Sequence, residues 1–275
     1  MGLFSIDREK CKRDGICVSE CPLRIIELRG DSPVPTPVEG AEQVCIRCGH
    51  CVSVCPHGAF SHSDMKPGDC PPVRRELALS IGQAEYFLRS RRSIRTYKDK
   101  RIEREKLQRL IEVARYAPTG TNSQQVGWLV IDSKEGVSSM AAMTIDWMRH
   151  MVQEDNPFAR AYRMAGIVRA WEGGLDLICR GSAGLVIVHA PAEYAAAQVD
   201  STIALTYLDL AAPSFGLGTC WAGFFMIAAS CWPPLQQALD LPEGRRCCGA
   251  MMIGYPKYIY HRLPLRREPN ITWHD

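Results

Sequence analysis

The sequence contains no long hydrophobic run, and no apolar stretch approaches the ~20 residues that a helix needs to cross a bilayer. Its first residues, MGLFSIDREKCKRDG, include no apolar segment of the kind that a secretion signal requires. No predicted strand is followed by a G-x-G-x-x-G segment, so a Rossmann dinucleotide domain is not indicated. We therefore expect a soluble, cytoplasmic protein that does not enter a membrane.

An excess of charge of one sign is also lacking. The 275 residues carry a formal net charge of +3, and basic and acidic residues are mixed along most of the chain. Proteins that bind nucleic acid usually carry a marked basic excess, so nucleic acid is not an expected partner. The apolar fraction of 46% is ample for a buried core, and the length predicts one or two domains.

Cysteine, in contrast, is plentiful and unevenly placed. Seven of the thirteen cysteines fall within residues 11–55. Two segments, KCKRDGICVSECP at 10–22 and VCIRCGHCVSVCP at 44–56, superimpose with a fixed offset of 34 residues, and Asp14 stands where the second copy has Cys48. In a chain without a secretion signal, such clustering favours a metal site over disulfides.

The second copy has the C-x2-C-x2-C-x3-C-P spacing of bacterial two-cluster ferredoxins, in which the last cysteine of each copy ligates the other cluster. This rule predicts a [4Fe–4S] cluster on Cys21, Cys45, Cys48 and Cys51, and a second cluster on Cys11, Asp14, Cys17 and Cys55. A carboxylate is a harder ligand than a thiolate, so we expect the Asp14 cluster to be either [4Fe–4S] or [3Fe–4S].

Two alternatives remain open for these residues. C-x2-C is also half of a zinc site, although zinc sites usually pair two such halves and do not space three cysteines by three. Alternatively, Asp14 only caps the turn before Gly15, and Cys70 serves as the eighth ligand. His50 and His57 lie beside the ligands, where surface positions or hydrogen bonds to the clusters are favoured over ligation.

The rest of the chain predicts a linker at 63–76, rich in proline, glycine and charge, between a domain at 1–62 and a second domain at 77–275. Apolar residues at helical spacing predict helices at 83–92 and 103–116, and a central helix that ends at Gly216. Short apolar runs predict buried strands at 127–133, 184–191, 219–225 and 247–256. Residues 138–178 are expected to be mostly helical, and the class is α+β.

The one basic concentration, RSRRSIRTYKDKRIEREK at 89–106, contains closely spaced arginines that suit a phosphate, although a charge run is by default a solvated face. This stretch and the PTGTNSQ loop at 118–124 resemble the start of the flavin-dependent nitroreductase superfamily. GLGTCWAGFF at 216–225 resembles the family's flavin-side turn, and residues 254–273 resemble its ending. The resemblance covers about residues 80–275; QVGW at 125–128 departs from the family's usual Pro-Trp.

The resemblance implies a nitroreductase-like α/β/α FMN-binding domain after the small ferredoxin-like iron–sulfur domain. It implies FMN contacts from the following residues: Arg91, Arg92, Ser93, Arg95, Pro118, Thr119, Gly120, Asn122, Trp221, Ala222, Gly223, Arg266 and Arg267. In the family, a backbone N–H at the position of Gly223 faces flavin N5. The resemblance also implies a homodimer with two FMN sites at its interface, and no catalytic side chain stands out.

Together, the two parts predict an FMN-dependent oxidoreductase that takes electrons through iron–sulfur clusters. Its expected substrate is an electrophilic small molecule such as a nitroaromatic, quinone or enone. Reduced ferredoxin or flavodoxin is the favoured electron donor, with NAD(P)H as an alternative. Two other functions remain open: an electron-transfer protein that relays electrons to a partner, and a zinc-stabilised binding module. An aromatic-lined, open flavin face would favour the enzyme. The aromatic residues of 147–171, however, are expected to pack in the core rather than to cover a substrate pocket.

Overall fold

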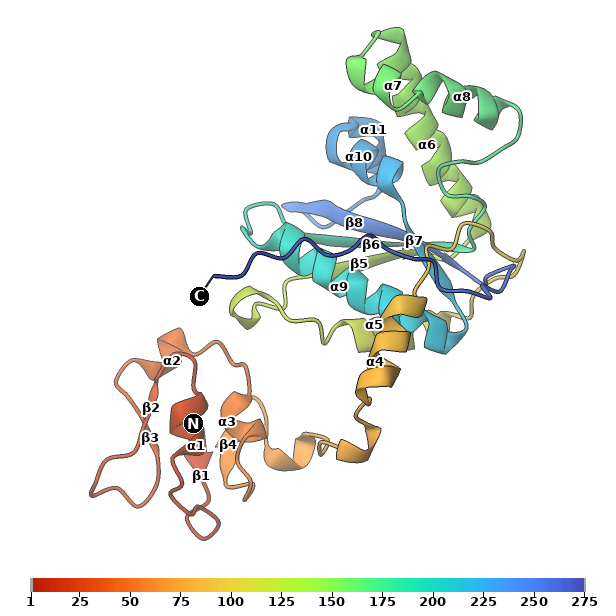
Figure 1. Ribbon diagram of the computed structural model, residues 1–275. Coiled ribbons are helices and arrows are strands. Elements are labelled where there is room, and N and C mark those ends of the chain that lie inside the picture. Colours follow the sequence, from red (N-terminus) through yellow and green to blue (C-terminus); the bar gives the residue numbers. More distant parts are fainter. Residues whose placement is uncertain (1, 275) are drawn as a thin grey trace. The chain divides into compact units, whose positions relative to one another are not determined.

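The computed structural model describes residues 2–274 (Figure 1). By its internal contacts, the chain divides into two compact units. The first unit holds the residues up to Ala78 together with Thr121–Ser123, and the second holds Leu79–Gly120 and the residues from Gln124 onward. The domain and linker boundaries expected from composition stay predictions, because contacts and composition divide the chain by different criteria.

The first unit is built from short elements around its cysteines. Its two antiparallel sheets pair β1 (Phe4–Ile6) with β4 (Phe60–His62), and β2 (Ile26–Glu27) with β3 (Thr36–Pro37). The helices are α1 (Ile16–Glu20), α2 (Ala41–Val44) and α3 (His50–Ser53), followed by the short 3-10 helices η1 (Pro67–Asp69) and η2 (Arg75–Leu77). The 34-residue repeat is visible in the backbone, because α1 and α3 each follow a left-handed glycine, Gly15 with φ 73° and Gly49 with φ 74°.

The second unit is organised around a four-stranded antiparallel sheet. Its strands are β5 (Gly127–Ile131), β6 (Gly184–Pro191), β7 (Gly218–Trp221) and β8 (Arg245–Gly254), in the spatial order β5-β6-β8-β7. The helices are α4 (Ile81–Ser90), α5 (Arg104–Ala114), α6 (Lys134–Gln153), α7 (Pro157–Ala161), α8 (Met164–Glu172), α9 (Ala197–Ala211), α10 (Gly223–Cys231) and α11 (Pro233–Ala238), with 3-10 turns η3 (Gly120–Asn122) and η4 (Ala212–Phe215).

Both faces of this sheet are buried, and successive side chains of its central strands point to opposite faces. On β6, Val186 and Val188 pack with α5 and α9 on one face, while Leu185 and Ile187 pack with α6 and α10 on the other. The strands are therefore apolar throughout, and helices cover the sheet on both sides as three layers (Figure 1). This α/β/α arrangement agrees with the predicted α+β class.

The strand predicted at 219–225 is in part a helix. The apolar run at 219–225 forms a strand only up to Trp221, and helix α10 begins at Gly223. An apolar run alone does not distinguish a buried strand from a buried helix, and Gly223 marks the change. The predicted central helix is confirmed: α9 continues through η4 to Gly216, whose φ of 71° ends it. No helix within residues 2–274 is both long and apolar enough to cross a membrane.

Candidate functional site

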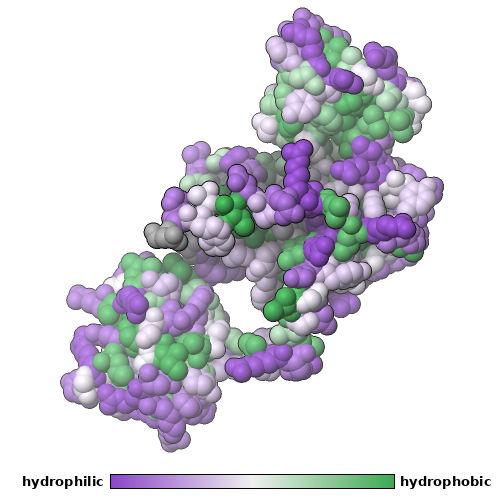
Figure 2. Space-filling view, viewed as in Figure 1, coloured by the Kyte–Doolittle hydropathy of each residue, from purple (hydrophilic) through white to green (hydrophobic). Residues whose placement is uncertain are grey.

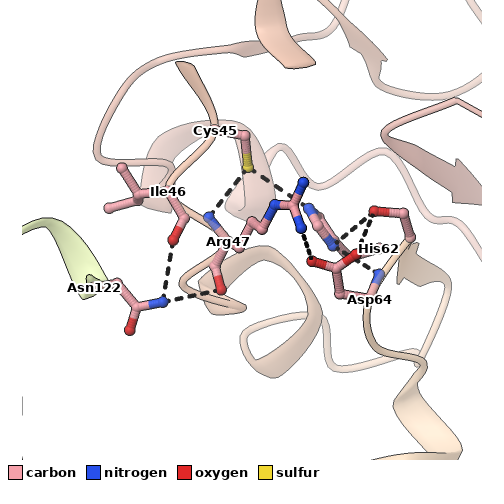
Figure 3. A network of polar contacts seen from close by, with 7 residues as sticks. Cys45, Ile46, Arg47, His62, Asp64 and Asn122 are labelled. Carbon is pink, nitrogen blue, oxygen red and sulfur yellow. Dashed lines mark hydrogen bonds and ion pairs between the residues drawn. The ribbon is translucent and has the colours of Figure 1, made fainter. Parts of the chain in front are cut away.

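The four cysteines predicted for the first cluster surround one cavity in the first unit. A void of about 30 Å³ is lined by Cys21, Cys45, Cys48 and Cys51 among mostly apolar neighbours. The Cys45 Sγ accepts a hydrogen bond from the backbone N–H of Arg47 at 3.4 Å and lies 3.6 Å from His62 Nε2 (Figure 3). Burial raises the pKa of the Cys51 thiol to about 11.

A second void, of about 20 Å³, is lined by the other predicted set: Cys11, Asp14, Cys17 and Cys55. The Cys55 Sγ accepts a hydrogen bond from the N–H of Ala59 at 3.3 Å. Asp14 accepts the N–H of Ile16 on Oδ1 at 3.2 Å, and its Oδ2 lies 3.8 Å from His57 Nε2. Asp14 therefore caps the turn and also borders the void, whereas Cys70 packs in the apolar core of this unit and is not part of the lining.

The donor set suits iron–sulfur clusters. In the part of the chain that the structure describes, no three His, Cys, Asp or Glu side chains converge closely enough to hold a single metal ion. The cysteines are instead distributed around two separate voids, one with four thiols and one with three thiols and a carboxylate. A polynuclear cluster needs ligands spread over its corners, whereas four zinc ligands converge to within ~2.3 Å of one ion.

In the second unit, the arginine segment 91–95 lies beside β7. The backbone N–H of Ile94 donates to the Thr219 carbonyl at 2.8 Å, and the Tyr97 hydroxyl donates to the Ile94 carbonyl at 2.6 Å. Ile94 is buried in the core under the sheet. Two segments that the sequence assigns separately to a flavin, 91–95 and 216–223, are therefore neighbours in space.

The arginines of this segment have different partners. Arg91 forms an ion pair of 3.3 Å with the buried carboxylate of Asp209, which also accepts the hydroxyl of Thr219. Burial raises the pKa of Asp209, while the Thr219 hydroxyl and Arg91 act in the opposite direction. Part of the charge of Arg91 is thus already neutralised. Arg95 is exposed, and its guanidinium donates to the Ser93 carbonyl at 3.4 Å.

Arg92 is the best placed of them to bind an anion. Its Nε is buried and has no hydrogen-bond partner in the described chain, although its terminal nitrogen donates to the Arg89 carbonyl. A buried N–H donor without a partner is costly, so a ligand oxygen at this position would stabilise the site. The neighbouring Ser93 hydroxyl accepts from Arg91 at 3.4 Å. This pattern fits the phosphate that the sequence predicts here.

Several hydrogen bonds hold the loop at 118–124 in place. The N–H of Gly120 donates to the carboxylate of Asp200 at 3.1 Å, and the Thr119 hydroxyl accepts the N–H of Gln124 at 3.0 Å; Pro118 is exposed. Asn122, which groups with the first unit, donates its amide to the Ile46 and Arg47 carbonyls at 3.1 and 3.2 Å (Figure 3). The flavin contact of Asn122 stays a prediction, since its amide is engaged here.

The turn after β7 presents backbone donors. Gly223 is the first residue of α10, and the N–H groups of a first helical turn have no intrahelical partner. A Cβ at Gly223 would meet nothing within 4 Å, so the space beside this backbone is open to a ligand. Ala222 is buried and Trp221 half-buried. Arg266 and Arg267 lie in an exposed segment after β8.

An aromatic group adjoins this turn. The ring of Tyr162 lies 6.1 Å from Phe224 in an edge-on contact and 4.4 Å from Phe158. Tyr162 is 52% exposed, whereas Trp147 is only 2% exposed and belongs to the core. Figure 2 shows hydrophobic surface in the region of α7 and α8. The predicted core role of these aromatics is thus right for Trp147, while Tyr162 is a surface side chain.

Three polar residues at these sites were not predicted from the sequence: His62, Asp200 and Asp209. Each is buried, with an exposed fraction of 6% or less. Asp200 and Asp209 are acids within the otherwise apolar helix 197–211, and buried acids usually have a partner. That signal was available in the sequence. For His62 the sequence offered no signal, because the 34-residue repeat places the apolar Leu28 at the equivalent position (62 − 34 = 28).

The fold and these sites define a class of protein: a ferredoxin-type module with two cysteine-lined cavities, joined to an α/β/α domain. Residues 3–56 match the 4Fe-4S dicluster domain, and residues 88–255, more than half of the chain, match the Nitroreductase family. The chain therefore belongs to the nitroreductase family and carries an N-terminal 4Fe-4S dicluster domain. It is an oxidoreductase, as the sequence predicts.

Solved structures show the same fold for the second unit. A nitroreductase with bound FMN from Bacteroides fragilis has a TM-score of 0.57 at 20% identity, covering 70% of this chain and 99% of its own. Another with bound FMN, from Desulfitobacterium hafniense, has a TM-score of 0.55 at 25% identity, covering 70% and 97%. A ferredoxin from Methanothermococcus thermolithotrophicus is 37% identical over 59 residues, 21% of this chain and 92% of that protein.

Proposed function

We propose that the protein is an FMN-dependent reductase that receives electrons through two iron–sulfur clusters and passes them to an electrophilic small molecule. The observation that carries this proposal is the pair of voids in the first unit. Each void is lined by the four residues that the ferredoxin crossover rule assigns to one cluster. The bound FMN of the two similar solved structures supports the flavin part.

When bound, the clusters would supply one-electron transfer, and FMN would supply the conversion of single electrons into two-electron reduction of an organic substrate. The chain's own residues have simpler tasks. Cys21, Cys45, Cys48 and Cys51 would hold a [4Fe–4S] cluster, and Cys11, Asp14, Cys17 and Cys55 would hold a cluster of three or four irons. The apolar lining of the first void would keep water from the cluster and so influence its potential.

On the flavin side, Arg92 would bind the phosphate through its partnerless Nε. Arg91, fixed by Asp209, would add positive potential and hold the segment in place. The helix start at Gly223 would offer backbone N–H groups and the positive end of the α10 dipole to the bound flavin. Roles for Ser93, Arg95, the 118–122 loop and Arg266 or Arg267 remain part of the proposal.

The aromatic group favours an enzyme over a simple electron relay. Tyr162, Phe158 and Phe224 form a partly exposed apolar surface that begins one residue after Gly223. Flat, electron-poor molecules stack on such rings, so nitroaromatics, quinones and enones are the proposed substrates. A pure relay would have no use for an open aromatic surface beside the helix start.

We also propose that two copies associate. The segment after β8 exposes large apolar side chains, with Leu265 94%, Trp273 83% and Ile259 81% exposed. Exposed apolar residues gathered in one segment indicate an interaction surface. A second copy of the chain is the expected partner, and sedimentation equilibrium of the holoprotein should give twice the chain mass. A monomer at micromolar concentration would contradict this part of the proposal.

The decisive experiment is stopped-flow reduction of the anaerobic holoprotein, following cluster and flavin absorbance separately. Reduced ferredoxin should reduce the flavin of the wild type rapidly, and Cys48→Ser, which removes a thiol of the first void, should slow this by at least tenfold. Cys231→Ser is the matched control, because this exposed cysteine lies on α10, outside both voids. Rapid reduction by NADH in a protein stripped of its clusters would refute the proposed route.

A further inference from the structure

His62 is a buried side chain that the proposed function does not yet use. It is the last residue of β4, is 4% exposed, and lines the same void as the four cysteines of the first set. Its Nε2 lies 3.6 Å from the Sγ of Cys45 (Figure 3). This distance is within the range of an N–H···S hydrogen bond. The position of the ring proton therefore decides whether His62 Nε2 donates a hydrogen bond to the sulfur.

The neighbours of His62 fix that proton on Nε2. The backbone N–H of Asp64 donates to Nδ1 at 3.1 Å, and the Ser63 hydroxyl lies 3.4 Å from the same atom. A ring nitrogen that accepts a backbone N–H carries no proton, so in the neutral imidazole the proton is on Nε2. Nε2 is therefore a donor, and it faces Cys45 Sγ.

The ring is held in this position by the backbone. β1 pairs with β4 in the register Phe4↔His62, and His62 exchanges two backbone hydrogen bonds with Met65, of 3.0 and 3.2 Å. Met65 in turn packs against Gly49, where a Cβ would lie 2.6 Å from its sulfur. The turn at 62–65 is thus fixed to the cysteine loop, and His62 is prevented from moving away from Cys45.

The second copy of the repeat has this donor and the first copy does not. The position equivalent to His62 is Leu28, whose side chain has no N–H group. Cys45 Sγ also accepts the backbone N–H of Arg47 at 3.4 Å, so it has two donors. Cys55, of the other set, has the backbone N–H of Ala59. The site with His62 therefore has a side-chain N–H donor to a cysteine sulfur that the first copy of the repeat does not supply at the equivalent position.

We propose that His62 raises the reduction potential of the cluster on Cys21, Cys45, Cys48 and Cys51 by donating Nε2–H to Cys45 Sγ. Reduction adds one electron and no proton, and it increases the negative charge on the thiolate sulfurs. A fixed N–H donor stabilises the reduced state more than the oxidised state, and burial strengthens the effect. The inference rests on the proposed binding of clusters and makes His62 a positioning residue for electron transfer.

The test is a potentiometric titration of the anaerobic holoprotein, with each reduced cluster followed by its electron paramagnetic resonance signal. In His62→Leu, the ratio of reduced to oxidised cluster at a fixed potential should fall about tenfold, as expected for a hydrogen bond to a charged group. For a one-electron couple this corresponds to 59 mV. The signal of the other cluster should not change. His62→Gln, which keeps an N–H donor, should restore part of the ratio.

Asp64→Asn separates charge from hydrogen bonding. It keeps the backbone N–H that orients His62 but removes the ion pair of 3.0 Å with Arg47. Under the proposal it does not lower the reduced-to-oxidised ratio. A fall in Asp64→Asn equal to that in His62→Leu could not come from charge, because the substitution removes a negative charge. It would show that disturbance of the turn at 62–65, and not loss of the His62 donor, lowers the ratio, which overturns the inference.

A measurement on the wild type covers the case in which His62→Leu loses its cluster. In protein labelled with ¹⁵N-histidine, pulsed resonance of the reduced cluster should show a nitrogen coupling that persists in His50→Gln and His57→Gln. Absence of this coupling would overturn the inference about His62 but leave the proposed function intact. An unchanged ratio in a His62→Leu protein with full iron content would do the same. Iron and sulfide analyses that find no clusters in the wild type overturn the proposed function as well.

Discussion

Gly218→Ala is expected to loosen the arginine segment, because Gly218 is the residue of β7 over which Ile94 packs. A Cβ at this position would lie 2.3 Å from Cγ1 and 2.9 Å from Cβ of Ile94, and 3.0 Å from Cγ of Pro256. The clashing atoms of Ile94 are near its backbone, so a rotation of the side-chain end cannot relieve them. The backbone of Ile94 is itself bonded to Thr219 at 2.8 Å.

The expected magnitude follows from two opposing effects. Forcing a methyl group into a packed core costs about 1–3 kcal/mol, and contacts this short place Gly218→Ala in the upper half of that range. Gly218 does not have a positive φ, so alanine fits the backbone and recovers about 0.4–1 kcal/mol through the unfolded state. We expect a net loss of about 1.5–2 kcal/mol, which lowers the melting temperature by roughly 3–8 °C for a domain of this size.

A double-mutant cycle with Ile94→Ala isolates the clash. Ile94→Ala alone should cost about 2–4 kcal/mol, because Ile94 is buried in the core. It also removes the Cγ1 atom that a Cβ at position 218 would strike, so Gly218→Ala/Ile94→Ala should be more stable than the sum of the single effects by at least ~1 kcal/mol. Urea unfolding followed by far-ultraviolet circular dichroism measures all three variants. FMN affinity, measured by fluorescence titration, should fall in Gly218→Ala.

Gly166→Ala is the matched control for this series. Gly166 lies inside helix α8, and a Cβ there meets nothing within 4 Å. It should therefore be neutral or stabilising by about 0.5–1 kcal/mol. Additive single effects in the cycle, or a Gly218→Ala protein as stable as the wild type, would show that Ile94 does not press on β7 as the structure indicates.

Three further predictions concern the metal ligands, the phosphate site and a buried histidine. If the wild type holds four irons at the second void, Asp14→Ala should lower the iron content by about one atom per chain without loss of the other cluster, whereas Cys70→Ala should leave it unchanged; loss of a cluster in Cys70→Ala would make Cys70 the ligand. Arg92→Gln should weaken FMN binding by at least tenfold in a fluorescence titration, and equal weakening in the exposed control Arg104→Gln would argue against a specific phosphate contact. Burial and the neighbouring Arg245 lower the pKa of His189 in the folded protein. As the pH falls below about 6.5, His189 is therefore protonated in the unfolded chain before it is protonated in the folded one. Unfolding free energy should therefore fall between pH 7 and the folded pKa, by at most about 1.4 kcal/mol per pH unit, and His189→Gln should flatten this slope in urea titrations at several pH values.

Much of the fold was predictable because its signals are local. The apolar strands, the helical spacing of 103–116 and the glycine that ends the central helix at Gly216 all depend on near neighbours in the chain. The family motifs correctly predicted a nitroreductase domain behind a dicluster domain. The ferredoxin spacing also predicted which cysteines line each void, because in that pattern the last cysteine of each copy belongs to the other set.

What the sequence did not reveal depends on contacts between distant residues. Arg91 and Arg92 look equivalent in the sequence, but Asp209, 118 residues after Arg91, pairs with one and leaves the other with a partnerless Nε. Likewise, the amide of Asn122 bonds carbonyls 76 and 75 residues earlier in the chain. No local pattern contains such pairings. The strand predicted at 219–225 was too long for a related reason, since burial and not periodicity decides where a short apolar run bends into a helix.

The pairing of β1 with β4 has an evolutionary consequence. Because the opening strand of the cysteine-rich module lies against its closing strand, the two ends of the module emerge side by side. A module with adjacent ends can be attached to, or inserted into, an unrelated scaffold without being pulled open. Gene fusion would then require only an in-frame join at the surface, and both strands of the β1–β4 pair would stay intact on joining.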